Sequence, residues 1–142
     1  MSSVFEKLNL KEHREIVVIN APASFEAELA TLKDVTVLRD LKKAKAVQFA
    51  LLFATTQTEV DSLSQTLVEK AKGDAVLWFA YPKGTSKNYT CDFNRDTGWN
   101  IIRSLGFDTV RAVAIDEDWS ALRFRRVEFI KAAMKKTAAK SN

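Results

Sequence analysis

The sequence has little of what metal and nucleophile sites need. Its 142 residues contain one cysteine, Cys91, and one histidine, His13. A single cysteine forms no internal disulfide, and one histidine cannot complete the clustered Cys and His ligands of the usual zinc sites. His13 also precedes the first predicted strand, at the wrong end of a sheet to join a Cys–His pair or a Ser–His–Asp triad. We therefore expect no metal, no cofactor and no catalytic nucleophile of these types.

Glycine and proline are also scarce. Four glycines and two prolines leave little linker, and the chain contains no internal repeat. The hydrophobic share of 46% and the charged share of 28% are typical of a globular chain. We expect one domain over residues 1–142. The net charge of +4 is modest, and much of the excess lies near the end of the chain, in Lys131, Lys135, Lys136 and Lys140.

The chain has no long hydrophobic run. The longest apolar stretch, residues 46–54, is interrupted by Gln48 and is too short to span a bilayer. The first fifteen residues carry charge throughout and lack the apolar core of a signal peptide. We therefore expect a cytoplasmic protein with no membrane association.

Short apolar runs alternate with amphipathic stretches along the chain. Runs rich in β-branched and aromatic residues predict strands at 16–20, 35–38, 46–54, 75–81, 110–115 and 121–127. The runs at 16–20 and 75–81 are typical of buried strands, whereas the alternation in 122–125 indicates one covered and one wet face. Helical spacing of apolar residues predicts helices at 4–10, 25–32, 57–72 and 94–105. Ser24 and Asn94 are the expected N-caps, and Gly73 and Gly106 the expected stops. A basic helix or tail is expected from about residue 128.

The last two predicted strands are joined by residues 116–120 alone. A connection this short can only form an antiparallel hairpin, because a parallel crossover needs a dozen or more residues. The pattern predicts an α/β fold, a three-layer Rossmann-like sandwich whose mainly parallel six-stranded sheet ends in that hairpin. If the fifth strand lies at the sheet edge, a second copy could cover it, so a homodimer is an open expectation.

This order of elements resembles the class I S-adenosylmethionine-dependent methyltransferases, shortened in the middle. The resemblance implies a sheet order of 2-1-3-4-6-5. More locally, the segments VINAP, WFAYPKG and IDEDWSALRFR, at residues 18–22, 78–84 and 115–125, look like a small bacterial α/β family to which no activity is assigned.

The methyltransferase resemblance departs at its cofactor site. Such enzymes close the first strand with a glycine-rich turn, but residues 20–23 read Asn-Ala-Pro-Ala. Residues 53–56 read Phe-Ala-Thr-Thr, where the resemblance implies an Asn/Asp-Pro-Pro-aromatic motif. Asp40 follows the second strand, where an acidic residue usually holds the ribose. The sequence therefore favours a non-catalytic binding or interaction domain. The alternatives are a methyltransferase-like enzyme with an atypical cofactor pocket, or a weak anion or nucleic-acid binder.

Ligands of open α/β sheets bind beyond the carboxyl ends of the strands, where the strand order reverses. We expect this crevice between strands one and three, although Pro22 and Pro82 could simply terminate their strands. The loop over residues 81–89 carries two lysines, two hydroxyls and a glycine, which could bind a small anion. The candidate ligand-binding residues are Asn20, Pro22, Thr55, Thr56, Lys83, Thr85, Ser86 and Lys87.

The hairpin supplies secondary candidates. Asp116 and Asp118 could bind a hard cation, but consecutive acids more often form a solvated turn or pair with nearby arginines. The arginines available are Arg111, Arg123, Arg125 and Arg126. Trp119 is expected to pack at the hairpin corner or to stack on a ligand. Nucleic-acid binding is not expected, because 18 acidic residues offset 22 basic ones and no recognition motif is present.

Overall fold

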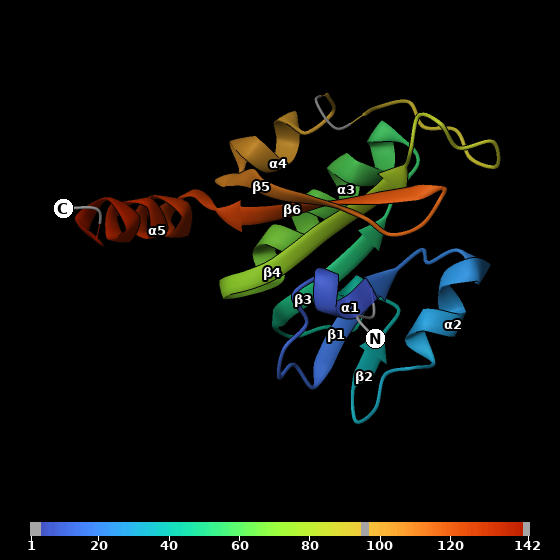
Figure 1. The fold of residues 1–142 in the computed structure, drawn as a ribbon, viewed down its shortest axis with the longest axis horizontal. Helices are drawn as coiled ribbons and strands as arrows, with labels where there is room; N and C mark the ends of the chain where they lie inside the picture. Colours follow the sequence, from blue (N-terminus) through green and yellow to red (C-terminus); the bar gives the residue numbers. More distant parts are fainter. Residues whose placement is uncertain (1–3, 95–96, 141–142) are drawn as a thin grey trace.

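The computed structural model describes residues 4–94 and 97–140, with side chains up to residue 134. Six strands form one sheet in the order β2-β1-β3-β4-β6-β5. The first four strands along this order pair in parallel, and β6 pairs antiparallel with both β4 and β5. The sheet order and the closing hairpin predicted from the sequence are confirmed, and β5 forms one edge (Figure 1).

The strands are β1 (Glu15–Ile19), β2 (Thr36–Leu38), β3 (Val47–Phe53), β4 (Ala71–Pro82), β5 (Phe107–Ala114) and β6 (Trp119–Arg126). The α-helices are α1 (Val4–Lys7), α2 (Glu26–Leu29), α3 (Gln57–Lys70), α4 (Asn100–Ser104) and α5 (Val127–Lys140). Two short 3-10 helices, η1 (Ala23–Phe25) and η2 (Leu41–Lys43), precede α2 and follow β2.

Side chains of the central strands alternate between two hydrophobic cores, one on each face of the sheet. In β3, Leu52 belongs to the core under α3 and α4, whereas Leu51 and Phe53 belong to the core under α1 and α2. This alternation follows from the two-residue period of a strand. Both faces of the central strands are therefore covered by helices, which explains why their sequences are continuously apolar.

Several predicted boundaries are wrong. The helix expected at 25–32 is a 3-10 turn followed by four α-helical residues, and no side chain caps either piece. The helix expected from Asn94 begins at Asn100. Asn94 instead forms a turn, in which its side-chain Oδ1 accepts the backbone N–H of Thr97. The helix expected to stop at Gly73 ends at Lys70, and β4 begins at once.

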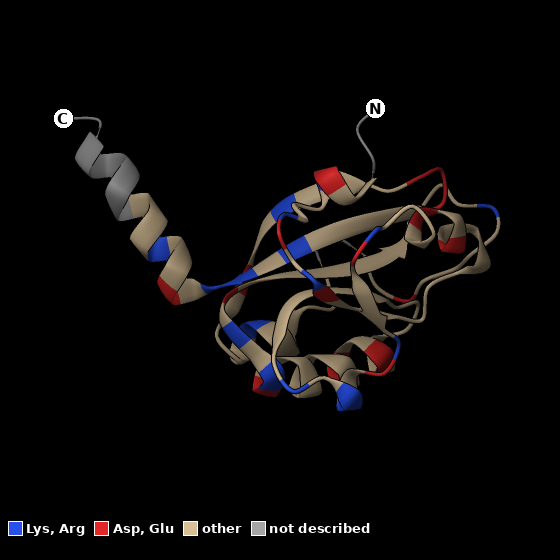
Figure 2. Cartoon of the chain, turned by 90° about the horizontal axis from the view of Figure 1, so that it is seen from below, with Lys and Arg blue, Asp and Glu red and all other residues tan. Residues whose placement is uncertain are grey.

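The two ends of the chain differ in their packing. α1 lies on the sheet, held by a 2.7 Å hydrogen bond from the buried indole Nε1 of Trp78 to the carbonyl oxygen of Leu8. α5 projects away from the sheet in both views (Figures 1 and 2). The tail lysines Lys135, Lys136 and Lys140 lie outside the described side chains. Within the described ranges, no helix combines the length and apolarity that crossing a membrane requires.

Candidate functional site

A crevice of about 400 Å³ opens at the carboxyl ends of β1 and β3. This is the point where the strand order reverses, which is where open α/β sheets bind ligands. Its volume lies within the range of small-molecule sites. Nine residues line it: Asn20, Ala21, Pro22, Phe53, Ala54, Thr55, Glu59, Tyr89 and Trp119.

Glu59 is the central polar group of this crevice. Thr56 caps α3, and Glu59 completes a reciprocal capping box three residues later. Its Oε1 accepts hydrogen bonds from the backbone N–H groups of Thr55 and Thr56, at 3.0 and 3.2 Å, and from both threonine hydroxyls. Among the described residues, its Oε2 accepts the side-chain amide of Asn20 alone, at 3.3 Å. One carboxylate oxygen is thus fully engaged, while the other keeps acceptor capacity.

Asn20 forms the turn that ends β1. Its φ of 58° lies in the left-handed region, which asparagine tolerates better than most residues other than glycine. Its side-chain amide donates to the carbonyl oxygen of Phe53 as well as to Glu59. Asn20 therefore supplies the backbone conformation for which a glycine would be expected, and it ties β1 to β3 and α3.

Aromatic rings also line the crevice. The Trp119 ring packs edge-on against Phe53 at a centroid distance of 5.1 Å and against Tyr89 at 4.8 Å. Trp119 is 3% exposed, and its buried indole Nε1 has no hydrogen-bond partner among the described residues. The expectation that Trp119 packs at the hairpin corner is confirmed. Its position also makes its ring part of the crevice.

The loop after β4 is hydrogen-bonded to the hairpin turn, and its residue Tyr89 lines the crevice. The Asp118 carboxylate accepts the Ser86 hydroxyl at 2.8 Å and the Asn88 amide, and the Asp118 carbonyl accepts the backbone N–H of Lys83. The Ser86 hydroxyl oxygen in turn accepts the backbone N–H of Tyr89 at 3.1 Å. Asp118 and Ser86 therefore hold the loop so that the Tyr89 ring packs on the Trp119 ring.

The structure brings together only some of the candidate residues. Asn20, Pro22, Thr55 and Trp119 line the crevice, and Thr56 borders it through its bonds to Glu59. The loop candidates Lys83, Thr85, Ser86 and Lys87 do not line it. Because the charged lining group is a carboxylate, an anion is a poor fit to this crevice.

Five of the nine lining residues were not among the candidates from the sequence: Ala21, Phe53, Ala54, Glu59 and Tyr89. A signal for Glu59 was present, because Thr56 followed by Glu59 at the start of a helical stretch is a capping-box pattern. No local pattern brings Tyr89 to Trp119, which is thirty residues away in the chain. That contact depends on how the loop docks on the hairpin.

A second, smaller cavity of about 160 Å³ lies beside Ile19, the residue before Asn20. Asp40 lies at its rim, after β2, and caps η2 by accepting the backbone N–H of Lys42 through Oδ1. The remaining lining residues are Arg39, Leu41, Lys42, Ser62, Leu63 and Thr66. Ile19 thus lines the smaller cavity, and the next residue, Asn20, lines the crevice.

The histidine and the cysteine lie away from one another. His13 lies before β1 in the chain, and its ring packs on Phe49. Burial lowers the pKa of its imidazole. Cys91 follows β4, and burial raises the pKa of its thiol, so the reactive thiolate is disfavoured. Neither side chain lines the crevice.

The hairpin acids form the turn that the sequence also allowed, and among the described residues neither Asp116 nor Asp118 pairs with an arginine. Asp116 accepts the backbone N–H groups of Asp118 and Trp119 and so shapes the turn itself. Arg125 pairs instead with Asp74 on β4, and Arg126 donates to backbone carbonyls at the start of β4. Among the described residues, no group of three or more His, Cys, Asp or Glu side chains could hold a metal ion.

Comparison with solved structures identifies the fold. The chain is similar to an S-adenosylmethionine-dependent methyltransferase from Aquifex aeolicus, with a TM-score of 0.60, 15% identity and coverage of 87% of this chain and 88% of that one. It is similar to the N-methyltransferase NodS from Bradyrhizobium japonicum WM9, with a TM-score of 0.55, 13% identity and coverage of 87% and 92%. The chain has the class I methyltransferase fold.

A third similar structure is the fibrillarin pre-rRNA processing protein of Methanococcus jannaschii, with a TM-score of 0.53 and 11% identity over 82% of this chain and 67% of that one. No family model matches the chain, and no curated protein sequence matches it significantly. The likeness is therefore one of fold, with the middle of the methyltransferase series shortened.

Proposed function

We propose that this protein binds S-adenosylmethionine across the end of β1, as a methyltransferase-like domain with an atypical cofactor pocket. One observation carries the proposal: the crevice combines the Glu59 carboxylate with the aromatic rings of Tyr89 and Trp119. An aromatic wall opposite a carboxylate favours a cation with apolar substituents. The sulfonium of S-adenosylmethionine is such a cation.

The bonding of Glu59 supports this assignment. Oε1 is held by the backbone and hydroxyl donors of Thr55 and Thr56, so the carboxylate has a fixed orientation. Within the part of the chain that the structure describes, Oε2 is bonded to Asn20 alone, so it can face a cation in the crevice. A carboxylate held in place before binding loses little conformational entropy when a ligand arrives.

The smaller cavity fits the nucleoside part. Asp40 uses Oδ1 to cap η2, while its Oδ2 accepts no hydrogen bond from the described residues and could accept ribose hydroxyls. Ile19, Leu41 and Leu63 offer an apolar lining for a flat base. The two cavities are lined by the consecutive residues Ile19 and Asn20, an arrangement that suits a ligand with a sulfonium at one end and a nucleoside at the other.

The departure from the usual glycine-rich turn lies in Ala21, Pro22 and Ala23. Their side chains are small, and Asn20 takes up the left-handed conformation at the start of the turn. S-adenosylmethionine supplies a transferable methyl group when it is bound. Glu59 is the crevice group suited to accept a proton from a methyl acceptor, so methyl transfer is the second step to test after binding.

Isothermal titration calorimetry with S-adenosylmethionine and S-adenosylhomocysteine tests the proposal. The two ligands differ in the charged sulfonium, and we expect the charged ligand to bind about tenfold more tightly through charge and cation–π attraction. Glu59→Gln should remove most of this preference while keeping an acceptor for the capping box. Tyr89→Leu should weaken the charged ligand more than the neutral one.

Glu69→Gln is the matched control, because Glu69 is an exposed carboxylate on the same helix and does not line the crevice. It should leave both affinities unchanged. If neither ligand binds at millimolar concentration, the proposal is wrong. If both bind equally well and Glu59→Gln changes nothing, the assignment of the sulfonium to this crevice is wrong.

A further inference from the structure

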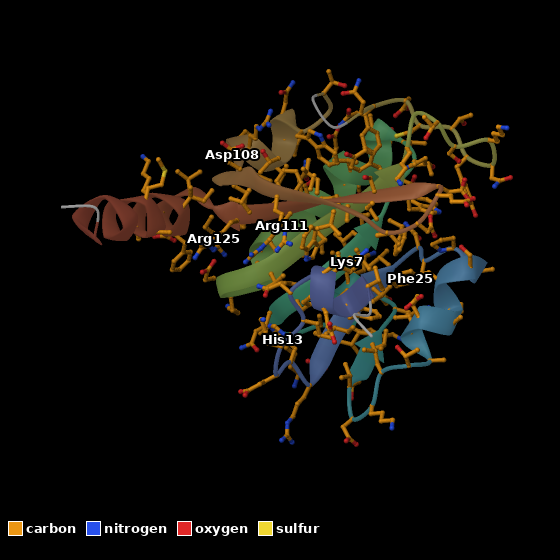
Figure 3. The ribbon with its side chains drawn as sticks, viewed as in Figure 1. Lys7, His13, Phe25, Asp108, Arg111 and Arg125 are labelled. Atoms are coloured by element: carbon orange, nitrogen blue, oxygen red, sulfur yellow. The ribbon has the colours of Figure 1, made fainter. Side chains whose placement is uncertain are left out.

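A cluster of arginines lies on the sheet, toward the opposite end of β4 from the crevice. Arg111 on β5 and Arg123 on β6 are direct partners in the antiparallel register, and Arg123 is also the partner of Trp78 on β4. Arg125 lies two residues further along β6 and therefore points to the same face. Figure 3 labels Arg111 on β5 and Arg125 on β6, and both side chains interact electrostatically with Arg123.

The charges of this cluster are unevenly neutralised. Arg125 is bonded through Nε and Nη2 to the two carboxylate oxygens of Asp74. Asp108, the other acid on these strands, accepts the guanidinium of Arg103 and the backbone N–H of Thr109. Both nearby carboxylates are thus already engaged.

Arg111 and Arg123 have no such partner. Neither guanidinium forms a hydrogen bond or an ion pair with any residue that the structure describes, and Nε of Arg123 is buried. Burial and the neighbouring Arg125 and Arg111 lower the pKa of Arg123. Like charges directly opposite one another on paired strands are destabilising. The charge of Asp74 partly offsets this repulsion at Arg123, but Asp74 is bonded to Arg125 and forms no ion pair with Arg111 or Arg123 in the described part of the chain.

We propose that Arg111 and Arg123 form a binding site for a phosphate group on the face shared by β5 and β6. The planar guanidinium presents paired N–H donors that match two oxygens of a phosphate. Arg111 is exposed and can approach a ligand, while Arg123 is half-buried and held between two neighbouring strands. The Arg125–Asp74 pair steadies the neighbouring backbone and keeps a third cation close.

The phosphate can belong to a nucleic-acid backbone or to a small phosphate ester, and two probes distinguish them. Fluorescence anisotropy with a labelled 20-nucleotide single strand measures the first, and titration with inorganic pyrophosphate measures the second. Binding to the strand should weaken as salt rises, and losing one phosphate contact should reduce the slope of log K against log salt by about 0.7.

Arg111→Gln is the decisive variant, because its side chain is exposed and the substitution should not disturb folding. It should weaken binding of the phosphate probe about tenfold, the value of one charge-assisted contact. Arg123→Lys keeps the charge but loses the paired donors, and it should weaken binding as well. Arg14→Gln, an exposed arginine just before β1, is the matched control and should have no effect.

Binding of either probe that is weakened by Arg111→Gln and not by Arg14→Gln supports the site. If neither probe binds at low salt, or if the two variants weaken binding equally, the site is refuted. Because this face is separate from the crevice, Arg111→Gln should not change the affinity for S-adenosylmethionine. The outcome therefore does not depend on the proposed function.

Discussion

Replacing Glu59 by alanine should destabilise the protein by more than its position on a helix surface suggests. Its carboxylate accepts the backbone N–H groups of Thr55 and Thr56 and the side-chain amide of Asn20. These bonds join the end of β1, the end of β3 and the start of α3. Because alanine is an excellent helix former, helix propensity does not contribute to the loss.

The size of the effect follows from those partners. Thr55 is half-buried, and leaving its donors unpaired costs about 1 kcal/mol. Losing the capping box and the link to Asn20 adds about 1 kcal/mol. Glu59→Ala should therefore lower the free energy of unfolding by about 2 kcal/mol. At about 4 °C per kcal/mol for a chain of this length, the melting temperature should fall by about 8 °C.

Urea unfolding followed by circular dichroism measures this difference, and Glu69→Ala on the same helix is the control. Glu69 is exposed, and its substitution should change stability by less than about 0.5 kcal/mol. Glu59→Gln keeps an acceptor and should lose only about 0.5 kcal/mol. Equal losses in Glu59→Ala and Glu69→Ala would refute the reasoning, since the crevice carboxylate would then hold nothing in place.

Two further predictions concern a glycine and an ion pair. Gly98 has a φ of +95°, and a Cβ there would lie 2.7 Å from the Cβ of Phe93, so Gly98→Ala should cost more than about 2 kcal/mol in urea unfolding. Gly84→Ala meets nothing within 4 Å and should be within about 0.5 kcal/mol of the parent. The hydrogen bonds from Arg125 lower the pKa of Asp74 in the folded protein. The pair therefore stabilises the fold at pH values above the pKa of Asp74 in the unfolded chain, about 3.9. This stabilisation is lost as the pH falls through the lower pKa of the folded state. Stability measured from pH 7 to pH 2 should therefore fall less steeply in Asp74→Asn, and an identical pH profile would contradict the assignment.

The positions of the strands followed from local patterns, whereas the full strand order came from the resemblance to the methyltransferases. Apolar runs such as 46–54 predicted β3 to within a residue at each end, because a strand covered on both faces must be apolar throughout. The short connection after Ala114 predicted the antiparallel hairpin, since geometry allows no other pairing. The start of α3 at Gln57 was predicted correctly, whereas the helix expected from Asn94 begins at Asn100, because Asn94 had two possible local structures and tertiary packing selected the turn.

The candidate site was predicted only in part, for the same reason. Asn20, Pro22 and Thr55 follow strand ends, so the rule for open sheets brings them together. Lys83 and Lys87 belong to the same loop as Tyr89, but docking through Asp118 brings the aromatic residue to the crevice and leaves the lysines off its lining. The crevice therefore has the opposite charge preference to the one inferred from loop composition.

The sequence alone determined the fold class, because the period of apolar residues and the lengths of the connections are properties of short segments. Only the tertiary structure decided which side chains meet across the sheet. It placed Glu59 and the rings of Tyr89 and Trp119 in one crevice, and it paired Arg111 with Arg123 across two strands, where neither is bonded to an acid among the described residues. Charge and aromatic contacts between distant segments depend on register and docking, which local patterns do not encode.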